Sequence, residues 1–539
     1  MTESTELLLE RILVEAKQFC RADGGTVYVR TKDDQLRFSI LRNDSMNLAQ
    51  GGSSGVDVSI PPLPLNDDKG KANLSNVATV AANLLISVNV DDVYQAEGYD
   101  FSGTRAFDKR AGYRTTSVLT IPLFNDRQRL IGVLQLINAR NSEGTVVAFT
   151  LEAQRAVEAL SRQAAIALDN QLLHQQQKLL LESFIKMIAS SIDAKSPYTG
   201  GHCERVPILL EMLASRAAAQ QEGPLAEFTL SEDEWYELRL AGWLHDCGKV
   251  ITPVHVMDKA TKLETIWDRV ALVKTRVEVL KRDLLLEALR GGASFAEAER
   301  DTAAERGRLD EALAFIERVN QGGEFLPDED KEHLAALAQL SYQEGGVERV
   351  LLDANELKNL SISRGTLTEE ERVIINGHMV HTIQMLEALP FPAHLSRVPE
   401  YAGGHHERMD GRGYPRGLFA GDMSIPARML AVADVFEALT AADRPYKKAK
   451  KLSEAMRIMG FMKKEHHLDP LIFDLFVRER VYLDYAQRFM EPEYIDEVDE
   501  DWLLDLHPEP IELPSEEERS QRGGGFLEEY RELLLDERS

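Results

Sequence analysis

The sequence predicts a multidomain chain in which an N-terminal α+β domain is joined by a long helix to an all-α bundle. The length of 539 residues exceeds what one hydrophobic core usually serves, so two or three domains are expected. Strand-like runs are confined to about the first 170 residues. From Leu151 to about Ile192 there is neither proline nor glycine, and apolar residues recur at three- and four-residue steps, which is typical of a helix.

The first part of the chain has the pattern of a sheet with helices packed on it. An amphipathic helix is expected over residues 7–19, followed by strands over 26–30 and 36–41 that a polar turn joins as a hairpin. A second pair of strands is expected over 117–124 and 130–138, again with a polar turn between them. Alternating strands with a helix at each end favour a sheet covered by helices.

The helical pattern continues from the long helix to about Glu491, and the chain divides accordingly. We expect an N-terminal domain over 1–170, a helical linker over 171–189, a helical domain over 190–490 with an insertion over 260–361, and an acidic tail over 491–539. The insertion is interpreted as a solvated helical hairpin, with a partner-binding surface as the alternative. The tail is expected to be mostly solvated, with one short helix.

The long helix offers two interpretations. It can pair with its copy in a homodimer and pass a twist or a shift along its length. A rigid spacer between two domains explains the same pattern equally well, so both interpretations stay open. A homodimer is the assembly that we expect.

The composition excludes several classes of protein. Three cysteines with no C-x-x-C pair argue against a disulfide framework or a cysteine-rich zinc site, and fit a reducing compartment. The formal net charge of −27 would repel nucleic-acid phosphates, and there is no basic patch with interleaved aromatics. No apolar run approaches the roughly 20 residues that cross a bilayer, and the acidic N-terminus does not resemble an export signal. We therefore expect a cytoplasmic protein with no membrane or nucleic-acid partner.

The strongest chemical signal is a cluster of histidines and acids in GGHHERMDGRGYPRGL, residues 403–418. It places the adjacent His405 and His406 beside two acidic residues and a glycine-rich turn. Histidine together with carboxylate suits Fe, Mn, Zn or similar divalent metals. In WLHDCGKVITP, His245 and Asp246 end a helical run, but a His-Asp pair has weight only in the company of further ligands.

Further candidate ligands are spread along the helical domain. His202 lies in DAKSPYTGGHCERV, His378 in TEEERVIINGHMVHTIQML and Asp434 in ARMLAVADVFEALT. Thr368 and Glu371 form a capping-box pattern, which predicts that His378 falls on the third turn of a helix. Asp434 lies in an otherwise apolar run, where a carboxylate is costly to bury unless it is paired or binds a metal.

The order of these motifs resembles the HD-GYP phosphohydrolases: a histidine, then HDxGK, a histidine on a helix, HHExxDGxGYPxGL, and the aspartate of AVAD. The resemblance covers roughly residues 190–488, with the segment near 260–361 as an insertion. It implies an all-helical fold of the HD superfamily. It also implies hydrolysis of the cyclic dinucleotide c-di-GMP to linear pGpG, or to GMP after a second cut.

The resemblance further implies roles for individual residues. It assigns these to a centre of two divalent metal ions: His202, His245, Asp246, His378, His405, His406 and Asp434. Asp246 would bridge the ions, and His202 would complete or flank the ligand set. The implied substrate contacts are Lys249, Tyr414, Arg444 and Lys447. Lys249 and Asp246 would also take part in catalysis, and Tyr414 would shape the mouth of the site.

Phosphodiester hydrolysis fits such a centre. A pair of metal ions about 3.5–4 Å apart can activate a hydroxide and clamp the phosphate, and Lys249 can add a positive charge. Iron or manganese is expected, because the ligands are histidine and carboxylate without thiolate. Some members of the family have a glutamate that recruits a third metal where this chain has Tyr198, so two ions are expected.

Two alternatives stand beside c-di-GMP hydrolysis. Thr382 occupies a position where the family often has glycine, and a pocket narrowed there would favour another cyclic dinucleotide, such as cyclic GMP-AMP, or another nucleotide. The other alternative is a non-catalytic signalling protein that senses a metal or a ligand. A missing ligand would favour that role, and none of the family's set is missing.

The first domain resembles a GAF domain in its order of strands and in the phrases YRTTSVLTIPLF and LIGVLQLINARN. GAF domains that bind cyclic nucleotides carry a signature that Asn138 and Phe149 match, but Ala139 and Ala153 replace its lysine and part of its acidic pair. The resemblance therefore predicts the GAF fold and regulation of the hydrolase. A small-molecule ligand and dimerisation alone remain as roles for the domain.

Overall fold

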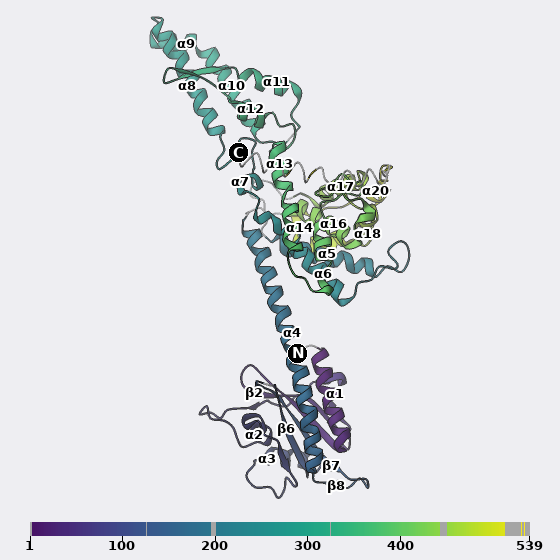
Figure 1. The fold of residues 1–539 in the computed structure, drawn as a ribbon. Coiled ribbons are helices and arrows are strands. Elements are labelled where there is room, and N and C mark those ends of the chain that lie inside the picture. Colours follow the sequence, from purple (N-terminus) through teal and green to yellow (C-terminus); the bar gives the residue numbers. More distant parts are fainter. Residues whose placement is uncertain are drawn as a thin grey trace. The chain divides into compact units, whose positions relative to one another are not determined.

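The computed structural model describes residues 3–125, 127–195, 201–323, 325–441 and 450–511, together with Phe526, Tyr530 and Leu533. The chain forms two compact units, Met1–Leu181 and Glu182–Ser539 (Figure 1). The boundary between them falls inside helix α4 (Leu151–Lys195), which confirms the expected long helix. No helix of the described residues is long and apolar enough to cross a membrane.

The first unit is built on an antiparallel sheet. Its elements are α1 (Glu3–Cys20), β1 (Ala22–Arg30), β2 (Gln35–Asn43), β3 (Leu48–Gln50), β4 (Leu63–Pro64), α2 (Val77–Leu84), β5 (Val88–Val90), α3 (Ser102–Ala111), β6 (Val118–Phe124), β7 (Leu130–Arg140), β8 (Val146–Val147) and the first part of α4. The main strand order is β3-β2-β1-β7-β6-β5, with β4 paired to β2 and β8 paired to β7. Both expected strand pairs are confirmed, as β1–β2 and β6–β7.

Helices cover both faces of this sheet. On one face α1 and α4 pack against the strands, and Leu13, Ala165 and Leu134 are fully buried there. The opposite face packs against α2, with Ala78 and Val133 fully buried. Apolar residues at helical spacing give each helix one face that it must bury, which produces these two layers.

The second unit is mostly helical, as predicted. It contains the end of α4, then α5 (His202–Ala218), α6 (Glu232–Leu244), α7 (Val254–Met257), α8 (Val270–Arg290), α9 (Phe295–Asp301), α10 (Ala303–Asn320), α11 (Asp328–Leu337), β9 (Ser341–Glu344), β10 (Val347–Val350), α12 (Ala354–Leu360), α13 (Glu369–Asn376), α14 (His378–Glu387), α15 (Val398–Gly403), α16 (Ile425–Thr440), α17 (Leu452–Lys464), α18 (Pro470–Arg478), α19 (Val481–Phe489) and α20 (Glu500–Asp505). The short 3-10 turn η2 (Cys247–Val250) follows α6.

The two largest hydrophobic cores among the described residues of the helical bundle join most of its helices. The larger core packs α5 and α16 against helices α17 to α20, and Leu210, Leu430 and Phe476 are fully buried in it. A second core joins the end of α4 to α6 and α15 through residues such as Ile192 and Leu240. Together the two cores fix the helices that carry the candidate ligands.

The insertion over 260–361 is a small folded body and not a helical hairpin alone. Its helices α8 and α10 pack on each other, but α11 and α12 complete a separate core in which Val277 and Leu351 are fully buried. The insertion also contains the antiparallel hairpin β9–β10, which corrects the expectation of helix throughout. Gly345 and Gly346 form its turn with φ values of +60° and +84°, as a two-residue hairpin turn requires.

The segment after Met490 is not solvated along its whole length. Leu503 of α20 is only 1% exposed, inside the larger core. Farther along, Tyr530 is 7% exposed and packs with Val373 and Val380. Leu503 and Tyr530 thus pack on the bundle, while the expectation of a mostly solvated tail stays a prediction, because most residues after 511 lie outside the described ranges.

Candidate metal centre

Seven candidate ligands come from five separate places in the second unit. His202 begins α5, His245 and Asp246 follow α6, His378 begins α14, His405 and His406 follow α15, and Asp434 lies within α16. All of these side chains are buried except that of His406, which is partly exposed. The fold therefore brings together every residue that the sequence analysis proposed as a metal ligand.

The helix that carries His378 differs from the expectation. The capping box of Thr368 and Glu371 is present at the start of α13, as predicted. However, α13 ends just before Gly377, and His378 begins the new helix α14, so it does not lie on the third turn of a single helix. A Cβ atom on Gly377 would lie 2.1 Å from the ring of Tyr530. Glycine permits this approach but is unfavourable inside a helix, which explains the break.

The ligand atoms form two groups that share one residue. The first group is Asp246, His378, His405 and His406, and the second is His202, His245, Asp246 and Asp434. Within each group the ligand atoms lie within 4.8 Å of one another. Each group contains imidazole and carboxylate, a combination that suits divalent transition metals.

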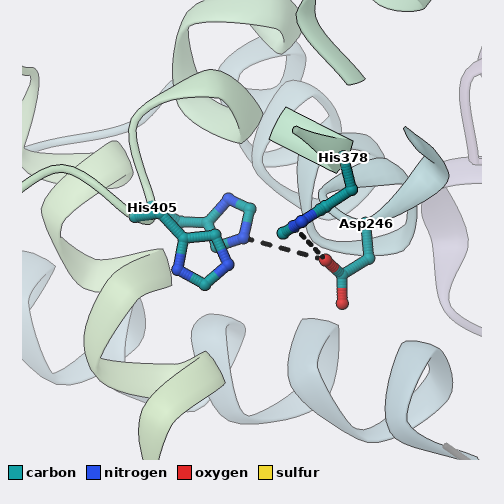
Figure 2. Close-up of side chains that lie close together, drawn as sticks. Asp246, His378 and His405 are labelled. Carbon is teal, nitrogen blue, oxygen red and sulfur yellow. Dashed lines mark ion pairs between the residues drawn. The ribbon is translucent and has the colours of Figure 1, made fainter. Parts of the chain in front are cut away.

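The two carboxylate oxygens of Asp246 face different groups. Its Oδ1 lies 3.3 Å from Nε2 of His378 and 4.0 Å from Nε2 of His405 (Figure 2). Its Oδ2 lies 3.2 Å from Nε2 of His245 and 3.5 Å from Nε2 of His202. A single carboxylate is thus in position to serve both groups at once.

Asp434 completes the second group. Its Oδ1 lies 3.3 Å from Nε2 of His202 and 3.7 Å from Nε2 of His245. The two imidazole nitrogens are 3.2 Å apart. Two ligand atoms that each lie about 2.1 Å from one ion, at right angles, are about 3 Å apart. These separations therefore fit ligands of a common ion.

Hydrogen bonds orient the histidine rings toward the centre. Nδ1 of His245, of His378 and of His405 each donates to the backbone carbonyl three residues earlier, at 2.8, 2.6 and 2.6 Å. This fixes the proton on Nδ1 and leaves the lone pair of Nε2 for a ligand. Nε2 of His378, Nε2 of His405 and Oδ1 of Asp246 are buried and have no hydrogen-bond partner among the described residues. Such atoms are costly to bury alone, and a cation between them would satisfy all three.

A carboxylate behind the second group orients His202. Oε2 of the buried Glu437 contacts Nδ1 of His202, and Arg205 Nε donates to Oε1 of the same carboxylate at 2.6 Å. A carboxylate that accepts from the far nitrogen of a ligating histidine is a common way to fix its ring. The sequence analysis missed Glu437, although its spacing of three residues from Asp434 places both acids on one face of α16.

The two groups differ in how their imidazoles bind protons. Burial, helped by the charge of His245, lowers the pKa of His405 to about 4, and burial beside other histidines holds the pKa of His406 well below its usual range. Burial also opposes charge on His245, but Asp246 and Asp434 outweigh it and raise the pKa of His245 to about 9. At neutral pH the imidazoles of His405 and His406 are therefore uncharged and able to bind a cation. A cation bound at the second group would displace protons.

The turn η2 brings Lys249 next to the shared carboxylate. Its Nζ lies 2.6 Å from Oδ2 of Asp246. Gly248 lets this turn press on α14, because a Cβ atom there would lie 1.9 Å from the carbonyl oxygen of His378. The N–H of Gly248 donates to the hydroxyl of the fully buried Thr382 at 2.9 Å. Thr382 therefore holds η2 in place, and the narrowing of the pocket that was expected from it stays a prediction.

The loop after α15 folds back on the first group. Glu407 is fully buried, and its carboxylate accepts from the backbone N–H groups of Arg416 and Leu418 at 2.8 and 2.9 Å. The ring of Tyr414 stacks on that of His406, with centroids 4.9 Å apart and planes at 17°. Tyr414 therefore lies beside the first group, and its expected place at the mouth of the site stays a prediction.

Three residues of the sequence analysis, Tyr198, Arg444 and Lys447, lie outside the described residues, so their roles stay predictions. His381 belongs to neither group of ligand atoms. Its Nε2 is instead hydrogen-bonded to the hydroxyl of Tyr530 at 2.7 Å. This side chain thus ties the described C-terminal residues to α14.

Comparisons with protein families identify both parts of the chain. Residues 4–168 match the family model of the GAF domain, and residues 326–472 match that of the HD domain. The chain therefore carries a GAF domain followed by an HD domain, which confirms the fold class predicted from the sequence. The first three candidate ligands precede the HD match.

Curated relatives match shorter parts of the chain. The 3'3'-cGAMP-specific phosphodiesterase 1 of Vibrio cholerae is 44% identical over 117 residues, which are 21% of this chain and 26% of the relative. A probable cyclic di-GMP phosphodiesterase of the same organism is 34% identical over 141 residues, which are 25% and 32%. The cyclic di-GMP phosphodiesterase response regulator RpfG of Xanthomonas campestris pv. campestris is 28% identical over 254 residues, which are 45% and 64%. The chain thus spans about a quarter to a third of the length of the first two relatives.

Proposed function

We propose that this chain, which carries a GAF domain and an HD domain, is a metal-dependent phosphodiesterase that hydrolyses c-di-GMP to linear pGpG. The observation that carries the proposal is the position of Asp246, whose two oxygens face two separate groups of histidines. Relatives named cyclic di-GMP phosphodiesterases support the substrate class.

The proposed cofactor is a pair of divalent ions of iron or manganese. The seven candidate ligands offer imidazole and carboxylate without thiolate, which suits these ions. When bound, the pair would neutralise phosphate charge and lower the pKa of a water molecule. The unsatisfied buried atoms of Asp246, His378 and His405 support the fit of a cation to the first group.

The remaining roles follow from the surroundings of the two groups. We assign to Lys249, beside the shared carboxylate, the stabilisation of negative charge that develops on the phosphate. Tyr414 presents its ring next to His406, and we assign to it a contact with the substrate at the mouth of the site. Arg444 and Lys447 are assigned phosphate contacts on the strength of the family resemblance.

We further propose a homodimer in which α4 lies at the interface and the GAF-like domain, residues 1–170, regulates the hydrolase domain, residues 190–490. Among the exposed large apolar side chains of this helix, four lie at regular spacing: Leu173 at 46%, Leu180 at 57%, Phe184 at 51% and Met187 at 56%. Their spacing of seven, four and three residues is that of the apolar positions of a coiled coil. A second copy of α4 would cover them.

A second candidate substrate is 3'3'-cGAMP. The observation in its favour is the relative of Vibrio cholerae that carries this substrate in its name. The two cyclic dinucleotides share the ring of phosphodiesters and differ in one base. They would therefore use the same metal centre, and the residues that contact the bases would decide between them.

The full chain, purified without oxygen and loaded with iron or manganese, is expected to convert c-di-GMP to pGpG, as measured by chromatography of the products. His405→Ala is expected to lower kcat at least about a hundredfold, because it removes one candidate ligand of the first group. The matched control is His333→Ala, whose exposed ring stacks on Phe315 within the insertion and whose loss should leave kcat unchanged.

Two outcomes of this experiment would change the proposal. A metal-loaded chain that turns over neither cyclic dinucleotide would contradict the enzymatic function. A higher kcat/KM for 3'3'-cGAMP than for c-di-GMP would instead favour the second candidate substrate. Appearance of GMP after pGpG would add a second cut to the same reaction.

A further inference from the structure

The last turns of α4 are an integral part of the helical bundle that carries the candidate ligands. Ile185, Ala189 and Ile192 are at most 4% exposed and belong to the same core as Leu244 of α6 and Tyr401 of α15. Their spacing of four and three residues puts all three on one face of α4. The ligand-bearing ends of α6 and α15 therefore pack directly on this helix.

Asp193, in the last turn of α4, supports the start of α5. Its carboxylate accepts from the backbone N–H of Cys203 at 3.3 and 3.4 Å, and the residue is only 8% exposed. The N–H groups in the first turn of a helix lack partners within the helix, and Gly201 at the N-cap of α5 has no side chain to supply one. Asp193 therefore anchors the turn on which His202 lies.

Lys195, the last residue of α4, holds the segment that follows Asp246. Its Nζ donates to the carbonyl oxygens of Lys249, Val250 and Thr252, at 3.0, 2.5 and 2.6 Å. An ammonium group has three N–H donors, so all of them are used. These carbonyls belong to η2 and its continuation, the turn that begins directly after Asp246.

We propose that Asp193 and Lys195 are positioning residues, through which the end of α4 sets the geometry of the two groups of candidate ligands. The inference rests on the proposed metal centre. It makes the two side chains unequal: Asp193 acts on His202, which belongs to the second group alone, whereas Lys195 acts on Asp246, which both groups share. A displacement of α4 would thus reach the metal centre through two separate contacts.

The unequal roles give a test that does not depend on hydrolysis. The full chain, freed of metal with a chelator, is titrated with Mn²⁺ while the free ion is followed by electron paramagnetic resonance. The wild type is expected to bind two ions in resolvable steps. Asp193→Ala should weaken one step about 10- to 100-fold and leave the other unchanged, and Lys195→Met should weaken both steps by a similar factor, as is typical when a group that orients a ligand is lost.

Two matched variants separate positioning from folding. Lys186→Met removes an exposed lysine of the same helix, whose ammonium lies over the ring of Trp243, and should change neither binding step. Lys195→Arg keeps N–H donors at this place and should restore most of the affinity that Lys195→Met loses. Should Lys195→Met fail to fold, as judged from its Tm, Lys195→Gln makes the same comparison with Lys195→Arg.

The outcomes are distinct from those that test the enzyme. Unchanged affinity at both steps in folded Asp193→Ala and Lys195→Met would overturn the inference, and so would equal weakening of both steps by Asp193→Ala. A wild type that binds two ions but hydrolyses no cyclic dinucleotide would contradict the proposed function and leave the positioning roles supported. A wild type that binds no Mn²⁺ would overturn both.

Discussion

Asp246→Asn is expected to abolish hydrolysis and to leave the chain with one metal ion or none. The amide keeps the shape of the carboxylate but has a single weakly basic oxygen and no charge. It therefore cannot provide one oxygen ligand to the group of His378 and another to the group of His245. Loss of the two-ion arrangement removes several kcal/mol of transition-state stabilisation, on the order of a thousandfold or more in kcat. Metal analysis and a turnover assay on the same sample measure both effects.

The control for this substitution is Asp484→Asn. Asp484 pairs with Arg216 at 3.0 Å, and both side chains are nearly half exposed. An exposed ion pair contributes little to stability, so kcat and metal content should match the wild type. If Asp246→Asn retained two ions and wild-type turnover, the shared carboxylate would have no role and the proposed centre would be wrong.

Gly248→Ala is expected to lower kcat at least about a hundredfold and to lower Tm, because the turn η2 has no space for a side chain. The added Cβ would lie 1.9 Å from the carbonyl oxygen of His378, and 2.6 and 2.7 Å from the amide nitrogen and the hydroxyl of Thr382. All of these atoms are fixed within α14, so η2 must move away. That movement would carry Asp246 and Lys249 away from His378.

Gly421→Ala provides the comparison, because nothing lies within 4 Å of a Cβ atom at Gly421. It is expected to change neither kcat nor Tm by a measurable amount. Steady-state kinetics together with thermal unfolding would detect both effects. Wild-type kcat in Gly248→Ala would mean that η2 can separate from α14 without disturbing the site, and the close contact at Gly248 would then have no part in positioning Asp246.

Local patterns predicted the start of several elements but not where they end. The capping box of Thr368 and Glu371 marks the start of α13 because both side chains act within one turn. The break comes at Gly377, where glycine is unfavourable inside a helix and where the ring of Tyr530, from a distant part of the chain, approaches closely. A contact of that kind leaves no signal in the residues around the break.

The insertion over 260–361 differs from its predicted helical hairpin for another reason. Its charged, amphipathic stretches predict helices, and helices form, but charge alone does not reveal that α8, α10, α11 and α12 share a core. The hairpin β9–β10 did have a local signal in the sequence. The pair Gly345-Gly346, which favours a two-residue turn, lies between two short stretches in which polar and apolar residues alternate. The helical pattern on either side outweighed it.

The candidate ligands could be named from the sequence because their residue types and order resemble a known family. Their division into two groups could not be predicted from the sequence, because it depends on how α5, α6, α14, α15 and α16 pack. Only the fold reveals that Oδ1 of Asp246 faces the first group of ligands and Oδ2 the second. The same holds for Glu437, Asp193 and Lys195, whose partners lie in other elements.

The most direct test of the two-ion centre is an anomalous difference map from crystals of the full chain loaded with iron or manganese, recorded at the absorption edge of that metal. A carboxylate shared by two ions predicts two peaks in each chain. One should lie among Oδ1 of Asp246 and the imidazoles of the first group, and the other among Oδ2 of Asp246, the two imidazoles of the second group and Asp434. A single peak, or peaks that do not contact Asp246, would contradict the central claim that this carboxylate joins two metal sites.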